Sequence, residues 1–223
     1  MDGAILREQI VALEWDMFQH TNNRGGRAAC QDDYATFSKM RLAQFSAWSA
    51  GAAESYLADL TAAQAQSRNL VAEKYLRMMK YTHPAEYAAQ RHLLPPDSAE
   101  KEALAEEICA ELLAQTVALR KVFPLVGARG RPMFSEADAG GFVSFQTYQL
   151  GELLTYSEET LRLLRAHLLA LKAAGRSLAE EVTARSVCAC GFSSLQEAET
   201  FLAAEQARQA KQKSGVLPGG PGQ

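Results

Sequence analysis

The chain has 223 residues, of which 48% are hydrophobic and 22% charged, and its formal net charge is −3. These values are ordinary for a soluble globular protein, and the length suits one generous domain or two small ones. The basic residues are scattered along the chain, whereas a nucleic-acid-binding protein needs a basic patch or stripe. No apolar run approaches the ~20 residues that cross a membrane. We therefore expect neither nucleic acid nor a membrane as a partner.

The cysteines and the N-terminus both favour a cytoplasmic protein. The first residues are acidic and amphipathic, unlike a signal peptide. The four cysteines, Cys30, Cys109, Cys188 and Cys190, are too few and too irregularly placed for a secreted disulfide framework. We expect all four to be reduced thiols.

The first predicted helix covers residues 5–20, because its apolar side chains recur at the spacing of one helical face. Residues 21–26 are rich in asparagine and glycine and are expected to end it. Asp32 or Asp33 is expected to cap a second helix that runs to about residue 48.

Three shorter helices are predicted next. Gly51 is expected to interrupt the chain before a helix over residues 52–66. Asn69 is expected to cap a helix over residues 70–81. A short helix then begins at Pro84, because proline is favoured at the first helical position.

Asp97 and Glu100 resemble a capping box ahead of a long helix that ends near residue 123. Residues 124–141 contain four glycines and two prolines and are expected to be irregular. This stretch is the best candidate for a lid or a partner-facing loop.

Residues 144–154 predict a further helix. Thr155 with Glu158 is expected to cap the helix that follows, and Ser177 and Ser194 are expected to open two more.

No alternation with a period of two is sustained anywhere in the chain, so the predicted fold class is all-α. The caps indicate a single compact domain of about eight to ten helices over residues 1–210. Residues 211–223 are rich in glycine, proline and lysine and are expected to form a disordered C-terminal tail.

Four of the predicted helices carry charged or polar side chains inside an apolar or aromatic stripe. These side chains are Glu14, Arg41, Gln44, Lys74 and Glu152. A charge buried alone costs several kcal/mol, so such groups are paired, hydrogen-bonded or exposed to a pocket. Two interpretations stay open: ion pairs that join helices in the core, and a pocket that binds a small anionic or zwitterionic ligand.

In the pocket interpretation, the two anions and the two cations converge and neutralise one another. Glu14 or Glu152 would then serve as a general base. Arg41 and Lys74, together with Arg27, would hold an anionic group of the ligand. The polar side chains expected to line the same space as ligand-binding candidates are Gln31, Gln44, Tyr75, Tyr148 and Tyr156.

Residues 25–33 form the most polar break between two of the amphipathic segments. Here Cys30 follows Arg27 and precedes a predicted helix start, and both a cation and a helix N-terminus favour a thiolate. Cys30 is therefore a candidate nucleophile or redox-active thiol. Two aspartates that follow it oppose this, and a free cysteine is commonly just a small buried residue.

The sequence predicts no metal site. Asp16 and His20 lie one helical turn apart, but such pairs are usually solvated contacts on a helix face. Cys188 and Cys190 are a poor chelate without partners, and no zinc, di-iron or phosphate-loop motif is present. The identity of any cofactor is left open.

Several stretches together resemble an uncharacterised bacterial family, a domain of unknown function common in anaerobic gut and soil bacteria. They are EWDMF (14–18), GGRAACQ (25–31), FSKMRLAQF (37–45), RNLVAEKYLRMM (68–79) and GELLTYS (151–157). The resemblance covers nearly the whole chain up to the tail and implies no activity. It does imply a candidate protein partner, because relatives occur beside or fused to a nucleotidyltransferase-like domain.

The leading hypothesis is a small-molecule-binding or enzymatic protein that uses the polar pocket. One rival is a non-catalytic helical adaptor whose partner surface includes residues 124–141. A third hypothesis is a thiol-based sensor, which requires an exposed and unusually acidic Cys30.

Overall fold

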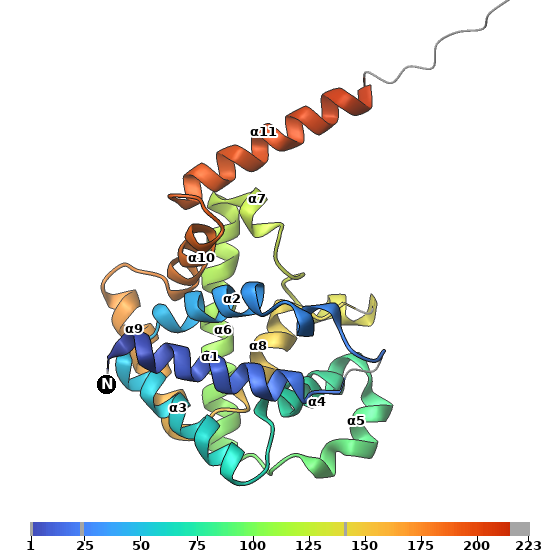
Figure 1. Ribbon diagram of the computed structural model, residues 1–223, viewed down its shortest axis with the longest axis vertical. Coiled ribbons are helices and arrows are strands. Elements are labelled where there is room, and N and C mark those ends of the chain that lie inside the picture. Colours follow the sequence, from blue (N-terminus) through green and yellow to red (C-terminus); the bar gives the residue numbers. More distant parts are fainter. Residues whose placement is uncertain (1, 23–24, 141, 215–223) are drawn as a thin grey trace, which may run out of the picture.

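The computed structural model describes residues 2–22, 25–140 and 142–214, and every regular element within these ranges is helical (Figure 1). This confirms the all-α fold class. Asn23, Arg24 and Gly141, which belong to the expected loops, lie outside the described residues, as does the expected tail from residue 215. None of the described helices is long and apolar enough to span a membrane.

The described α-helices number eleven, one more than the upper end of the expected range. They are α1 (Gly3–Gln19), α2 (Tyr34–Ser46), α3 (Ala50–Ala65), α4 (Leu70–Thr82), α5 (Pro84–Gln90), α6 (Ala99–Val122), α7 (Pro124–Gly127), α8 (Phe145–Leu153), α9 (Glu158–Ala173), α10 (Leu178–Ala189) and α11 (Leu195–Ser214).

Helix starts follow the expected caps at four positions. The side chains of Asp33, Asn69, Ser177 and Ser194 each accept a hydrogen bond from the backbone N–H three residues further on. Such bonds satisfy N–H groups that have no partner within the helix.

Two expected caps are wrong, because a neighbouring serine takes the position. Ser98, not Asp97, caps α6, and Ser157, not Thr155, caps α9. The Asp97 carboxylate instead pairs with Arg77, which lies on α4.

The expected break at Gly51 is also misplaced. Ser49 caps α3, which begins at Ala50, so Gly51 lies inside the helix. The chain leaves α2 at Ala47, four residues before the glycine.

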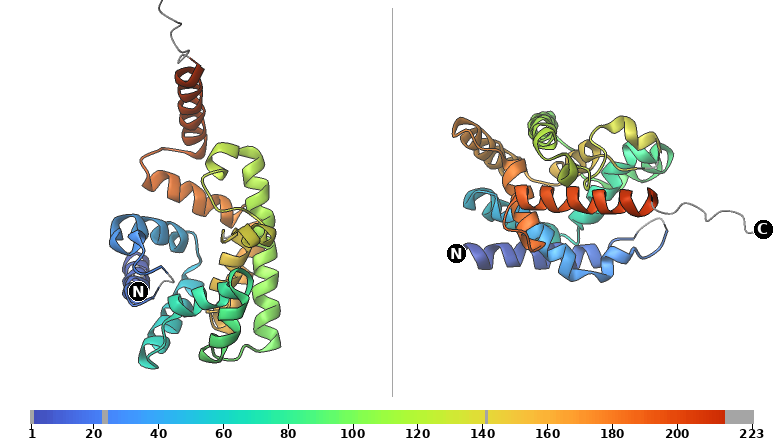
Figure 2. Two further views of the ribbon diagram at one scale, coloured as in Figure 1. Left: turned by 90° about the vertical axis from the view of Figure 1, so that its right-hand side faces the viewer. Right: turned by 90° about the horizontal axis from the view of Figure 1, so that it is seen from above.

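The core lies between two groups of helices (Figures 1 and 2). The long helix α6 packs against α8, α9 and α10, and α1 packs against α2, α3 and α4. Contacts of α3 with α9, of α4 with α8 and of α2 with α10 join the two groups. The most deeply buried apolar side chains come from both groups: Ile10, Phe45, Leu60, Ile108, Leu153, Tyr156 and Leu161.

The stretch 124–141 is more ordered than expected. It contains the four-residue helix α7 and a 3₁₀ helix over Ser135–Gly140. The carboxylate of Glu199 on α11 accepts hydrogen bonds from the backbone N–H groups of Leu125 and Val126, each at 2.8 Å. From this contact α11 projects away from the body of the molecule and ends at Ser214, so residues 211–214 are helical (Figure 1).

Candidate functional site

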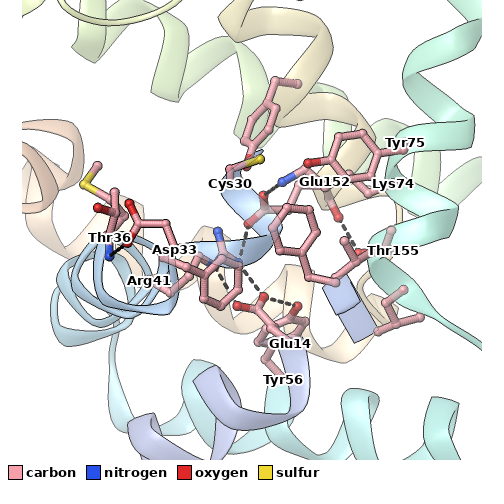
Figure 3. A pocket seen from close by; sticks show the side chains of 16 residues that line it. Glu14, Cys30, Asp33, Thr36, Arg41, Tyr56, Lys74, Tyr75, Glu152 and Thr155 are labelled. Atoms are coloured by element: carbon pink, nitrogen blue, oxygen red, sulfur yellow. Dashed lines mark hydrogen bonds and ion pairs between the residues drawn. The ribbon is translucent and has the colours of Figure 1, made fainter. Parts of the chain in front are cut away.

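The charged side chains expected inside apolar stripes converge at one place (Figure 3). Arg41 on α2 donates from Nε to Oε2 of Glu14 at 2.6 Å, and its Nη2 donates to the other oxygen of the same carboxylate. Nη2 also lies 3.0 Å from Oε1 of Glu152 on α8. Arg41 therefore joins carboxylates that are 138 residues apart in the chain.

Glu152 is the most heavily hydrogen-bonded member of this network. Its Oε1 accepts from Arg41, from the amide of Gln44 at 3.0 Å and from the hydroxyl of Tyr156 at 2.8 Å. Its Oε2 accepts from the ammonium of Lys74 on α4. The network is thus a closed set of two anions and two cations held by α1, α2, α4 and α8.

A close approach of two helices positions the Lys74–Glu152 pair. A Cβ atom on Gly151 would lie 3.0 Å from Cγ of Met78 and 3.2 Å from the carbonyl oxygen of Lys74. Glycine favours this close approach of α8 to α4, because a Cβ atom at these distances would force its neighbours to move by a few tenths of an ångström. The next residue, Glu152, consequently lies against the side chain of Lys74.

Burial and charge act in opposite directions on the network. Burial alone would raise the pKa of Glu152, but the charges of Arg41 and Lys74 and the hydrogen bonds that it accepts hold that pKa far below its usual range. Burial would lower the pKa of Lys74, yet the charge of Glu152 leaves it raised. Both groups are therefore ionised at neutral pH.

The network has more donor capacity than its own carboxylates use. Arg41 makes four hydrogen bonds with its five N–H groups, to Glu14 twice, to Gln44 and to Glu152. Lys74 donates one of its three N–H groups to Glu152, and no other acceptor is found among the described residues. The remaining donors suit a ligand that carries oxygen acceptors.

A cavity of about 240 Å³ lies against this network. Its walls are mainly aromatic and aliphatic, and Phe18 stacks on Phe37 with ring centroids 5.5 Å apart. Lys74 Nζ lies 3.5 Å from the ring centroid of Tyr148. The lining residues are Glu14, Phe18, Cys30, Asp33, Thr36, Phe37, Met40, Arg41, Tyr56, Leu70, Val71, Lys74, Tyr75, Tyr148, Glu152 and Thr155.

The hydroxyls of Tyr75 and Tyr148 are available to a ligand, since neither has a hydrogen-bond partner among the described residues. Burial, together with Tyr148, raises the pKa of Tyr75, so its hydroxyl is a neutral donor at neutral pH. By contrast, Tyr56 donates to Glu14 at 2.7 Å, and burial with that neighbouring charge raises its pKa well above the ordinary value.

Seven of the eleven expected site residues line the cavity. They are Glu14, Cys30, Arg41, Lys74, Tyr75, Tyr148 and Glu152. Gln44 and Tyr156 do not line the cavity, but each donates a hydrogen bond to the Glu152 carboxylate.

Arg27 and Gln31 instead stabilise their own loop. Arg27 pairs with Asp32 at the surface, and it also donates to the side chain of Gln19 and to the carbonyl of Gln31. The buried side chain of Gln31 donates to two carbonyls, those of Phe18 and Thr21.

Sequence reasoning missed the rim of the cavity and one residue of its base. Asp33 and Thr36 lie at the rim near the start of α2, and Tyr56 lies at the base on α3. Tyr56 carried a usable signal, because a tyrosine on a buried helix face needs an acceptor for its hydroxyl. Asp33 was identified as a helix cap, and its proximity to the cavity depends on the tertiary packing of α2.

The residues of the site that the structure describes offer hydrogen-bond donors to a ligand but no cluster of metal-binding side chains. No set of three or more His, Cys, Asp or Glu side chains that could hold a metal ion occurs within the described ranges. Cys30 is exposed and is the one thiol among the residues that line the cavity.

Comparison with known proteins gives a family and no activity. No curated protein and no solved structure matches the chain. A family model described as "Protein of unknown function (DUF4125)" matches residues 4–200, a range that includes every residue lining the cavity. The resemblance to an uncharacterised family is thereby confirmed, and the chain belongs to the DUF4125 family of proteins of unknown function.

Proposed function

We propose that this protein binds a small zwitterionic ligand with an apolar, ring-sized body in the cavity between α1, α2, α4 and α8. The observation that carries the proposal is the unused donor capacity of Lys74 and Arg41 at the base of a cavity with aromatic walls. Ligand sites typically combine such apolar walls with a few converging polar groups. An anionic group of the ligand would lie at Lys74, within reach of the hydroxyls of Tyr75 and Tyr148.

The rim of the cavity favours a zwitterion over a simple anion. Asp33 lines it, and hydrogen bonds from the backbone and side chain of Thr36 lower the pKa of its carboxyl, which is therefore ionised at neutral pH. A cationic group on the ligand would pair with Asp33, whereas an anion alone would meet its repulsion.

In this proposal Glu14 and Glu152 position the cations and are not proton acceptors. Their four oxygens accept seven hydrogen bonds, three at Glu14 and four at Glu152. A carboxylate whose pKa lies far below its usual range is a weak base at neutral pH. Binding is thus better supported than turnover.

The exposed thiol at the cavity provides the test. Alkylation of Cys30 by iodoacetamide is followed by peptide mass spectrometry with and without four probes that share one ring: phenylacetate, phenethylamine, phenylalanine and 4-(aminomethyl)benzoate. Cys188 and Cys190 are exposed elsewhere in the chain and serve as internal controls. A zwitterion is expected to slow alkylation of Cys30 alone, and to bind at least about tenfold tighter than either singly charged probe.

A matched pair of variants checks the role of the rim. Asp33→Asn keeps the helix cap, because asparagine caps as well as aspartate, but removes the charge. It is expected to weaken binding of the zwitterion and to leave binding of phenylacetate unchanged or tighter. Asp32 lies outside the cavity, so Asp32→Asn is expected to change neither affinity. Equal protection by all four probes, or by none, would overturn the proposal.

A further inference from the structure

A second, larger cavity of about 440 Å³ lies on the other side of Arg41, between α2, α6, α8 and α10. It shares only Met40, Arg41 and Tyr148 with the first cavity. Protein interiors are close-packed and contain few voids larger than a water molecule. A cavity of this size, whose lining surface is mostly apolar, falls in the usual range of ligand sites.

The apolar walls come from α6, α9, α10 and the turn that follows α2. Leu112 on α6, Leu164 on α9 and Leu178 on α10 are all buried, and Val182 and Trp48 are partly buried beside them. A chain of methylene groups placed here would be removed from water, and each buried methylene would strengthen binding.

The polar part of this cavity is positively charged. No acidic side chain is found among the described residues that line it, and two arginines are, Arg41 and Arg131. The charge of Arg41 is already balanced by Glu14 and Glu152. Arg131 forms no ion pair with any described residue; its Nη1 donates to the carbonyl of Val143 at 3.3 Å.

Arg131 is exposed and lies where solvent meets the cavity. Its guanidinium carbon is 4.4 Å from the ring centroid of Tyr148. Gln149, the next residue on α8, also lines the cavity, and its amide has no hydrogen-bond partner among the described residues. These side chains offer several donors to an anionic group that stays near water, while the buried leucines surround the rest of the ligand.

From this arrangement we infer that the second cavity binds an amphipathic carboxylate, an unbranched acyl chain whose carboxylate pairs with Arg131. The two cavities use different charged groups for their ligands, so either could bind its ligand while the other is empty. The shared residues form the wall between them.

Isothermal titration of the full chain with decanoate, below its micellar concentration, tests the inference. Affinity is expected to rise roughly tenfold for each two methylenes from hexanoate through octanoate to decanoate, as apolar burial predicts. Decanamide and decyltrimethylammonium carry the same chain without the negative charge and are expected to bind at least about tenfold more weakly. Equal binding of the cationic amphiphile would overturn the inference.

Variants that fill the second cavity test whether decanoate binds there. Val182→Trp fills it and is expected to abolish decanoate binding, with Ala179→Phe as a second filling variant if the first does not fold. Val122→Trp is the matched control, since Val122 is 68% exposed and does not line the cavity. Arg131→Gln is expected to lower affinity for decanoate and leave the weak binding of decanamide unchanged.

Unchanged decanoate binding in both filling variants would overturn the inference. The zwitterion's protection of Cys30 should persist in Val182→Trp. The decanoate titration therefore tests the second cavity, and the protection of Cys30 separately tests the first.

Discussion

Arg41 is the residue on which the buried network depends. It pairs with both carboxylates, and its side chain is only 12% exposed. A buried ion pair contributes little net stability when it is intact, because desolvation offsets attraction. Removing one partner is different, since the remaining charge then stays buried without compensation.

Arg41→Met is accordingly expected to lower the free energy of unfolding by about 3–5 kcal/mol, because Glu14 and Glu152 would lose their shared cation. Urea denaturation at neutral pH measures this. Arg162→Met is the control: Arg162 pairs with Glu100 and Glu158 at the surface, where solvent screens the charges and such pairs contribute little to stability. Similar losses in the two variants would show that the Arg41 network is solvated.

At the scale of helices, the sequence predicts what depends on neighbours in the chain. Helical periodicity and the caps Asp33, Asn69 and Ser177 are local, and they were found as expected. The cap of α6 was misassigned because two oxygen-bearing residues stand side by side. What decides between Asp97 and Ser98 is Arg77 on α4, which pairs with Asp97.

The site, too, could be predicted from the sequence only where a feature is visible within one helix. Periodicity identified Glu14, Arg41, Lys74 and Glu152, because a charge inside an apolar stripe is visible within one helix. Periodicity gives no information about Arg27, because this residue lies in a loop. Its hydrogen bonds go to Asp32, to Gln31 and to Gln19 on α1. Which side chains share one space depends on how the helices pack, and a single sequence does not contain that information in a local form.

The carboxylate of Glu199 joins α11 to α7. Glu199→Ala removes the acceptor for two backbone N–H groups at the start of α7. Hydrogen exchange in the first turns of α11 and in α7 is expected to accelerate roughly fivefold, as for the loss of a helix cap worth about 1 kcal/mol.

Glu205→Ala provides the comparison for that measurement. Glu205 lies further along α11 and pairs with Arg208 of the same helix. Its replacement should leave α7 unchanged. If Glu199→Ala also left α7 unchanged, the carboxylate would not hold the two elements together.

For the molecule as a whole, the network is expected to contribute to the pH dependence of stability. The pKa of Glu152 is lowered on folding, so its contribution is complete above the unfolded value of about 4.3 and declines as pH falls toward the folded value. The pKa values of Lys74, Tyr56 and Tyr156 are raised. Their contribution is complete below the unfolded values near 10 and is lost as pH rises through the folded ones.

The free energy of unfolding is therefore expected to be nearly constant between about pH 5 and pH 9 and to fall on both sides. Urea titrations at intervals of one pH unit from 3 to 11 measure this. In Glu152→Gln the decline below about pH 4.3 should be shallower, because the titrating carboxyl is gone. An acid limb of unchanged slope in that variant would show that Glu152 is not the group responsible.

The wall formed by Met40, Arg41 and Tyr148 has a thermodynamic consequence, because each of its faces belongs to a different cavity. A ligand on either side that shifts Arg41 or the Tyr148 ring alters the surface presented to the other side. Linkage requires the effect to be reciprocal: whatever factor the acyl chain imposes on the affinity of the zwitterion, the zwitterion imposes on the acyl chain. Through Arg41 and Tyr148, the binding of two chemically different molecules to this small helical domain would then be coupled.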